Sequence, residues 1–268
     1  MKRALVVLIL FVLAGPLAHG QRVTVPRDAA APGTTVRQQL LPAGHLRVGL
    51  NFGNVVLARR DGPGATPSGV AVDVARELAS RLQTTAEFIG YDDAGSVVDA
   101  AGKAWDVAFV GIDPARAAAV AFTSPYVIVE AAYLVRADSS LRSLADVDRP
   151  GVKIAAGPRS AYGLFLSRTL KQAAMVPVTG DAALAALQAG RVTAVAGLRS
   201  SLTVTATPTS GFRVLPGNFT GIEQGMAVAI ANVAARDYLE SFVAEIKRSG
   251  FVAAAIQRTG YTGASVPG

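Results

Sequence analysis

The sequence predicts an α/β protein of two lobes, each a mostly parallel sheet flanked by helices, with two connections between the lobes. Three observations predict this fold. Strand and helix patterns alternate at short intervals from residue 46 to 111, the alternation starts again near residue 152, and extended segments near 127–136 and 219–230 join the two passes. Such alternation is typical of βαβ units, whose neighbouring strands run parallel.

The first 20 residues have the pattern of a secretory signal peptide. Lys2 and Arg3 precede an apolar run from Ala4 to Ala14, and Ala18-His19-Gly20 offers small residues for cleavage before Gln21. The apolar run is too short to cross a bilayer comfortably. We therefore expect a cleaved signal peptide and an exported, soluble chain. Because the sequence has no cysteine, we expect neither a lipid anchor nor a disulfide framework.

Residues 21–44 are predicted to be a flexible leader, because they are rich in Pro, Gly, Gln and Thr and show no period. The chain has 26 basic and 19 acidic residues, and loss of Lys2 and Arg3 leaves a net charge of +5. The basic residues are scattered along the sequence. This spacing favours a solvated surface and argues against nucleic-acid binding.

Apolar periodicity places the expected elements within the two lobes. Lobe 1 is predicted to comprise residues 45–132 and 223–268, and lobe 2 residues 133–222. Alternating or continuous apolar runs predict strands, and apolar spacing of three to four residues predicts helices. The expected strands are 46–51, 86–91, 105–111, 152–156, 175–178, 192–196 and 224–230, and the expected helices are 70–82, 96–101, 160–170, 181–188, 234–247 and 251–258. Ser143 to Asp146 resembles a capping box.

Several kinds of chemistry are excluded by residue content. After cleavage the chain holds a single histidine, His45, and no cysteine, which leaves no histidine-based nucleophilic triad and no ordinary zinc site. Neither a P-loop nor a G-x-G-x-x-G motif is present. We therefore predict no metal, no cofactor and no catalytic residues.

Five segments together resemble a known family. In chain order they are LRVGLNFGNVVLA, SGVAVDVARELASRL, WDVAFVGIDPAR, FTSPYVIVEAAYLV and LADVDRPGVKIAAGPRSAYGLFL. They are similar to the bacterial extracellular solute-binding proteins of family 3, the periplasmic receptors of ABC importers for polar amino acids, from about residue 45 to about residue 260. The resemblance implies a type II periplasmic-binding-protein fold, periplasmic localisation, a small carboxylate-bearing ligand and an ABC permease as partner. We expect a monomer.

The resemblance also implies a ligand site between the lobes. Arg116, which follows a lobe 1 strand, stands where the family's arginine pairs with the ligand carboxylate, and the fork of a guanidinium suits that pairing. Phe52 would either stack on the ligand or pack in the lobe. Ser160 would either meet the carboxylate or only cap its helix. The full set of candidate ligand-binding residues is Asn51, Phe52, Asn54, Gly111, Asp113, Arg116, Ser160, Ala161, Tyr162 and Arg199.

Departures from the family pattern leave the ligand open between an amino acid and an organic acid. The family holds the ligand ammonium with a lobe 2 acid, where this sequence has Leu198 or Arg199. One hypothesis is therefore a dicarboxylate, whose second anionic group Arg199 would bind. The other hypothesis is an amino acid, whose ammonium group Asp113 would hold in place of the missing lobe 2 acid. Two alternative functions remain. One is a periplasmic dehydratase that uses Asp113 or Glu223 as acid or base, and the other is a ligand-sensing receptor for a membrane partner.

Overall fold

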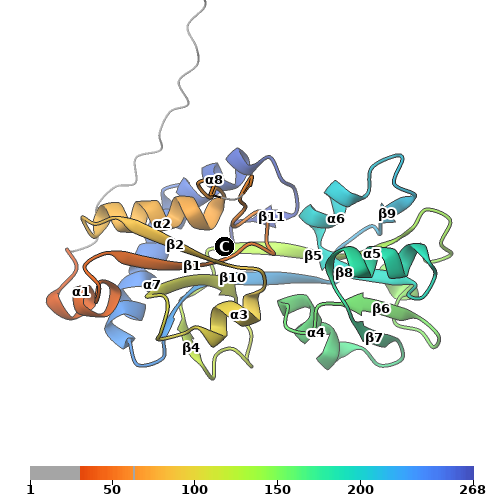
Figure 1. Cartoon of the computed structure of the whole chain (residues 1–268), viewed down its shortest axis with the longest axis horizontal. Helices are drawn as coiled ribbons and strands as arrows, with labels where there is room; N and C mark the ends of the chain where they lie inside the picture. The colour runs from red at the N-terminus through yellow and green to blue at the C-terminus, as the bar shows by residue number, and fades with distance from the viewer. Residues whose placement is uncertain (1–30, 63) are drawn as a thin grey trace, which may run out of the picture.

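The computed structural model describes residues 31–62 and 64–268 (Figure 1). The predicted signal peptide, residues 1–20, and residues 21–30 of the predicted leader lie outside the described residues. No helix in the described part of the chain is both long and apolar enough to cross a membrane.

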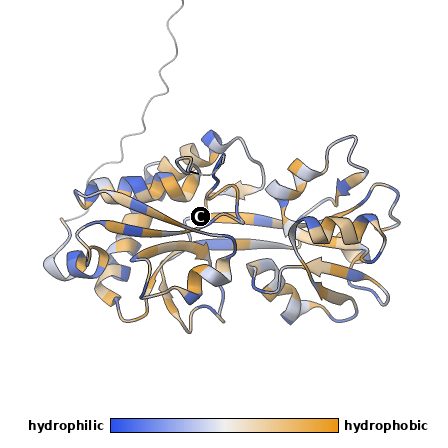
Figure 2. Ribbon diagram, viewed as in Figure 1, coloured by the Kyte–Doolittle hydropathy of each residue, from blue (hydrophilic) through white to orange (hydrophobic). Residues whose placement is uncertain are grey.

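One half of the molecule, which we call lobe 1, is built around a parallel sheet. Its central strand β1 pairs in parallel with both β2 and β3. Every residue of β3 is buried, as expected for a strand covered on both faces. Figure 2 shows apolar residues concentrated on the strands and on the inner sides of the helices. The elements of lobe 1 are α1 (Thr34–Leu40), β1 (Leu46–Asn51), α2 (Val70–Arg81), β2 (Ala86–Tyr91), α3 (Ala94–Asp99), β3 (Val107–Gly111), β4 (Val120–Phe122), α7 (Val233–Arg248) and α8 (Phe251–Thr259).

The other half, lobe 2, repeats this plan. Its central strand β6 pairs in parallel with β7 and β8. Two apolar clusters cover the opposite faces of the sheet, since Tyr133 and Val135 belong to one and Ala132 and Leu134 to the other. The elements of lobe 2 are a 3₁₀ helix (Leu144–Asp146), β6 (Lys153–Ala156), α4 (Ala161–Thr169), β7 (Ala174–Pro177), α5 (Gly180–Gln188), β8 (Ala194–Leu198), α6 (Arg199–Thr205) and β9 (Phe212–Val214). The capping box predicted at Ser143 is confirmed at the start of the 3₁₀ helix.

Two long strands, β5 (Val127–Arg136) and β10 (Thr220–Ala229), run through both lobes (Figure 1). They pair with each other in antiparallel fashion between the lobes, then β10 continues along β3 and β5 continues along β8. The strand order is therefore β2-β1-β3-β10-β5-β8-β6-β7. A short C-terminal strand, β11 (Ala264–Ser265), also pairs with β5. The lobe boundaries predicted at 132/133 and 222/223 fall inside these two strands.

Part of the predicted leader is instead an ordered helix. The prediction of a flexible segment is wrong for Thr34–Leu40, which form α1 against α7. Leu40 is fully buried in the lobe 1 core, and Gln39 accepts a hydrogen bond from the backbone N–H of Ala235 in the first turn of α7. Arg37 donates to the carbonyl of Leu82. Contacts with residues distant in sequence thus stabilise a helix whose own sequence carries little periodicity.

Candidate functional site

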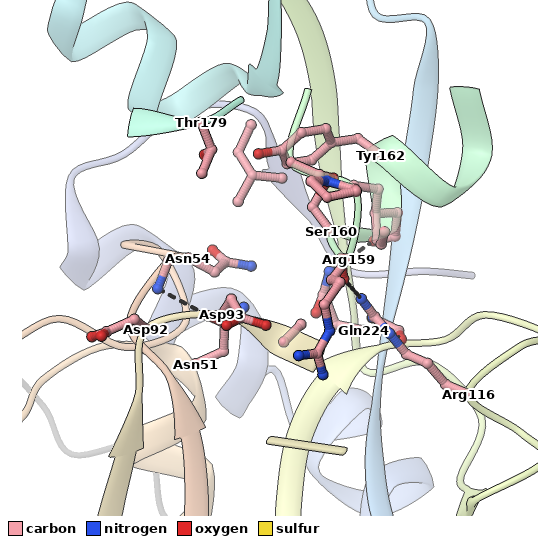
Figure 3. Close-up of a pocket in the computed structure, with 18 residues that line it drawn as sticks. Asn51, Asn54, Asp92, Asp93, Arg116, Arg159, Ser160, Tyr162, Thr179 and Gln224 are labelled. Atoms are coloured by element: carbon pink, nitrogen blue, oxygen red, sulfur yellow. Dashed lines mark hydrogen bonds between the residues drawn. The ribbon is translucent and has the colours of Figure 1, made fainter. Parts of the chain in front are cut away.

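A cavity of about 290 Å³ lies between the two lobes, lined by 18 residues (Figure 3). It is bounded by the carboxyl ends of lobe 1 strands, by the start of α4 in lobe 2 and by β10. Ligands of open α/β sheets bind at this edge of the strands. Seven of the ten candidate residues line it, namely Asn51, Asn54, Gly111, Arg116, Ser160, Ala161 and Tyr162.

Arg116 is the most buried charged group of this cavity, with 5% of its surface exposed. Its guanidinium donates to the carbonyl of Gly111 at 2.7 Å and, across the cleft, to the carbonyl of Arg159 at 2.8 Å (Figure 3). Burial lowers the pKa of Arg116, and the charges of Asp113 and Asp93 oppose this effect. A guanidinium has five N–H donors, and the remaining three make no hydrogen bond to a described residue. Arg116 also lines the cavity.

The lobe 2 wall around the start of α4 combines the charged Arg159 with the uncharged Ser160, Ala161 and Tyr162. Ser160 caps this helix by accepting from the N–H of Gly163 at 3.0 Å, and its hydroxyl donates to the carbonyl of Gly157 at 2.6 Å. The capping interpretation is therefore confirmed, and Ser160 also lines the cavity. The first N–H groups of a helix have no intrahelical partner, and Ala161 and Tyr162 carry these groups here. Burial raises the pKa of Tyr162, with Ser160 and Thr179 as its polar neighbours.

The lobe 1 wall adds amides and two carboxylates. Asn54 and Gln224 are nearly fully buried, and the Asn54 amide points into the cavity (Figure 3). Asp92 and Asp93 also line it, directly after β2. Asp93 accepts from the backbone N–H of Ser96 at 2.9 Å and from its hydroxyl at 2.6 Å, which caps α3. Burial favours the neutral acid, yet these hydrogen bonds outweigh it and lower the pKa of Asp93, with a smaller contribution from Arg159.

Three candidate residues do not line the cavity, which corrects the prediction for each. The Phe52 ring packs closely on Gly90, and the Arg60 guanidinium lies 4.8 Å from the ring centroid. Phe52 therefore packs on lobe 1, which was the alternative to ligand stacking. Asn51 ends β1 and lines the cavity, whereas Phe52 lies in the turn that follows the strand.

Asp113 and Arg199 are engaged elsewhere by ion pairs. Asp113 is 3% exposed, accepts from the backbone N–H of Ala115 at 2.9 Å and pairs with Arg168 at 2.8 Å. Arg199 pairs with Glu130 at 2.5 Å and donates to the carbonyl of Gly217. Asp113 is thus not the acid that replaces the missing lobe 2 carboxylate, and Arg199 does not present a second positive charge to the cavity.

The sequence argument missed Asp92, Asp93, Arg159 and Thr179. The carboxylates could have been found, because β2 is parallel to β1 and its carboxyl end must lie at the same edge as Asn51. Of three other polar residues on β5 and β10 or next to them, Gln224 lines the cavity, Glu130 faces Arg199, and Tyr126 is fully buried in a T-shaped contact with Phe109. Within the described residues, no group of three His, Cys, Asp or Glu is placed to hold a metal ion.

Comparison with known proteins identifies the family. The sequence profile of the bacterial extracellular solute-binding proteins, family 3, matches residues 46–259. The chain belongs to this family. Its fold, predicted as the type II periplasmic-binding-protein fold, is confirmed by solved structures of similar architecture.

Three of these structures illustrate the likeness. A binding component of an ABC transporter from Wolinella succinogenes, complexed with lysine, has a TM-score of 0.69 and 22% identity over 80% of this chain and 95% of its own. An amino-acid ABC transporter protein from Streptococcus pneumoniae, bound to L-arginine, has a TM-score of 0.69 and 19% identity over 83% and 97%. The ancestral amino-acid-binding protein AncCDT-1, a precursor of cyclohexadienyl dehydratase, has a TM-score of 0.68 and 22% identity over 84% and 99%. No curated protein sequence matches the chain.

Proposed function

We propose that this chain is the periplasmic solute-binding component of an ABC importer and that its lobes close on a small carboxylate-bearing solute. The single observation that carries the proposal is the position of Arg116. It is a buried guanidinium that lines the cavity between the lobes, with donors left for an anion. Burying a carboxylate is costly unless it is paired and hydrogen-bonded, and a guanidinium supplies both.

Family membership supports the importer role, and the names of similar structures support an amino-acid ligand. Those structures are described with lysine or L-arginine bound, or as a receptor for L-cysteine. The residues that line the cavity suit an amino acid as well as an organic acid. Asp92 and Asp93 of lobe 1 supply negative charge that would pair with the ammonium group of an amino acid. The argument for a dicarboxylate depended on Arg199, which is paired with Glu130 outside the cavity. We therefore favour an amino acid over a dicarboxylate.

The dehydratase alternative has less support. Of its two proposed acid or base groups, Asp113 is buried in an ion pair and Glu223 does not line the cavity. We propose no catalytic role for either residue.

The experiment is a thermal unfolding series on the mature protein with amino acids, dicarboxylates and aromatic acids. A ligand at about 100 times its dissociation constant stabilises the folded state by roughly 2.7 kcal/mol. We expect stabilisation of the wild type by an amino acid, loss of that stabilisation in Arg116→Ala, and an unchanged response in Arg136→Ala. Arg136 is an exposed arginine paired with Asp138 within lobe 2, which makes it a matched control. Stabilisation of Arg116→Ala equal to that of wild type would contradict the proposal.

A further inference from the structure

Two ion pairs join the lobes beside the cavity. The acidic residue of each pair does not line the cavity. Arg159, at the loop before α4, pairs with Asp99 at the end of α3 at 2.5 Å. Arg168, near the end of α4, pairs with Asp113 after β3 at 2.8 Å. In both pairs the arginine belongs to lobe 2 and the carboxylate to lobe 1. Neither Asp99 nor Asp113 is among the residues that line the cavity.

The side chain of Arg159 lies directly against α3 at Gly95. A Cβ added at Gly95 would lie 2.5 Å from Cζ and Nη2 of Arg159, and closer still to its Nε. A glycine at this position therefore gives the guanidinium room to lie directly on the helix. The same arginine accepts the hydrogen bond from Arg116 through its backbone carbonyl. Arg159 thus contacts lobe 1 twice, once through its side chain and once through its main chain.

The Arg168–Asp113 pair has a buried carboxylate, whereas the Arg159–Asp99 pair has an exposed one. The Asp113 side chain is 3% exposed, whereas Arg168 is 47% exposed. In the Arg159–Asp99 pair both side chains are at least half exposed, at 50% and 68%. Exposed pairs are weak and are screened by salt, and a buried carboxylate loses more when its partner is removed. The two pairs should therefore contribute unequally to closure.

We infer that Asp99 and Asp113 are positioning residues of the binding site, which hold lobe 2 against lobe 1 through Arg159 and Arg168. The inference deepens the proposed function and rests on it, because it describes how the same cavity is closed. The groups involved all belong to the chain, so the contacts favour the closed arrangement whether or not a solute is bound. A larger closed population raises the apparent affinity for a solute that binds the closed form.

The test measures the distance between the lobes. The chain has no cysteine, so Lys103→Cys and Lys171→Cys give two unique positions for spin labels, after α3 and after α4 respectively. Both lysines are exposed and neither takes part in the two pairs. Pulsed electron resonance on the protein without added solute then reports the ratio of closed to open populations.

We expect a closed population in the wild type that decreases as salt is raised. Asp99→Asn should lower the closed-to-open ratio about two- to fivefold, and Arg168→Gln about tenfold. Because the two pairs share no partner, their effects should multiply in the double variant. Asp138→Asn is the matched control, since it breaks an exposed pair of the same 2.5 Å length that lies wholly in lobe 2. It should leave the ratio unchanged.

A charge exchange separates a specific pairing from a general loss of structure. Asp99→Arg alone should open the cleft, and Asp99→Arg combined with Arg159→Asp should restore the closed population. An unliganded wild type that shows only the open distance, or a ratio that does not respond to Asp99→Asn and Arg168→Gln, would overturn the inference. In that case closure by an added amino acid would still uphold the proposed function. Conversely, a closed population that depends on both pairs but responds to no solute upholds the inference and contradicts the proposed function.

Discussion

Gly111 offers a direct way to obstruct closure from within the cavity. A Cβ at this position would lie 3.0 Å from Cγ2 of Ile222, 3.1 Å from Cβ of Ala161 and 3.2 Å from Nη1 of Arg116. Ala161 belongs to lobe 2, and Ile222 belongs to β10 where it passes between the lobes. Gly111→Ala therefore places a methyl group between the two lobes and beside the arginine that we assign to the ligand carboxylate.

The magnitude follows from these distances. Ordinary contact between carbon atoms begins near about 3.5 Å, so the closed arrangement must widen by a few tenths of an ångström at two places. Inserting a methyl group into a well-packed site costs about 1–3 kcal/mol. The open arrangement moves Ala161 away and relieves that contact, whereas Ile222 stays beside Gly111 because β10 is paired with β3. We expect the closed-to-open ratio to fall by a factor of at least about five.

Gly225→Ala is the matched control. Its Cβ would lie 3.0 Å and 3.1 Å from two side-chain atoms of Ile112 and 3.2 Å from the carbonyl of Thr123. These contacts are as close as those at Gly111, but all lie within lobe 1. Overpacking there should lower the thermal midpoint and leave the distance between the lobes unchanged.

The assay combines thermal unfolding of each variant with the distance measurement between spin labels attached through Lys103→Cys and Lys171→Cys. Our reasoning predicts opposite patterns, with Gly111→Ala changing the distance and Gly225→Ala changing the midpoint. If Gly111→Ala keeps the wild-type distance and loses stability as Gly225→Ala does, the methyl group is accommodated within lobe 1. The close approach of Ala161 to Gly111 would then play no part in closure.

Two further predictions concern parts of lobe 1. Leu40→Ala should lower the free energy of unfolding by about 2–5 kcal/mol in urea titrations, because Leu40 is fully buried. The exposed Gln38→Ala should change it little, and equal small effects would mean that α1 does not pack on the core. Asp93→Ala should cost about 1 kcal/mol through loss of the α3 cap, whereas Asp93→Asn should retain the capping hydrogen bond and lose only the part that depends on the charge. Because the pKa of Asp93 is lowered on folding, the contribution of its ionised form is fully present above pH ~4, the unfolded pKa, and is lost as pH falls through the folded pKa. The deficit of Asp93→Ala should therefore shrink in acid, and a deficit independent of pH would contradict the role of the charge.

The strands β1, β2, β3, β6, β7 and β8 were predictable, because each has a parallel neighbour and carries a continuous or alternating apolar run. The ranges 46–51 and 86–91 agree with β1 and β2 at both ends. The helix Thr34–Leu40 was not predictable by the same reasoning. It has seven residues and gains its stability from α7 and from the carbonyl of Leu82, which lies 45 residues from Arg37.

The site was predictable where a residue's position depends on the end of a strand. Arg116 and Asn51 lie in the cavity for this reason. The partners of Asp113 and Arg199 were not predictable, because they lie 55 and 69 residues away in the chain. A charged residue near a strand end faces either the ligand or a distant opposite charge, and only the fold decides between them.

Arg116 connects the two proposals, because it donates across the cleft and also lines the cavity. A solute carboxylate and the carbonyl of Arg159 draw on donors of the same guanidinium, so Arg116→Ala should impair both solute binding and closure. Asp99 pairs with Arg159 of lobe 2 and does not itself line the cavity. Its replacement should therefore lower affinity only by the factor by which it lowers the closed population. For Asp99→Asn, the loss of affinity should equal the loss of closed population. If it does, and if Arg116→Ala loses much more affinity, recognition of the carboxylate is separated from closure of the lobes.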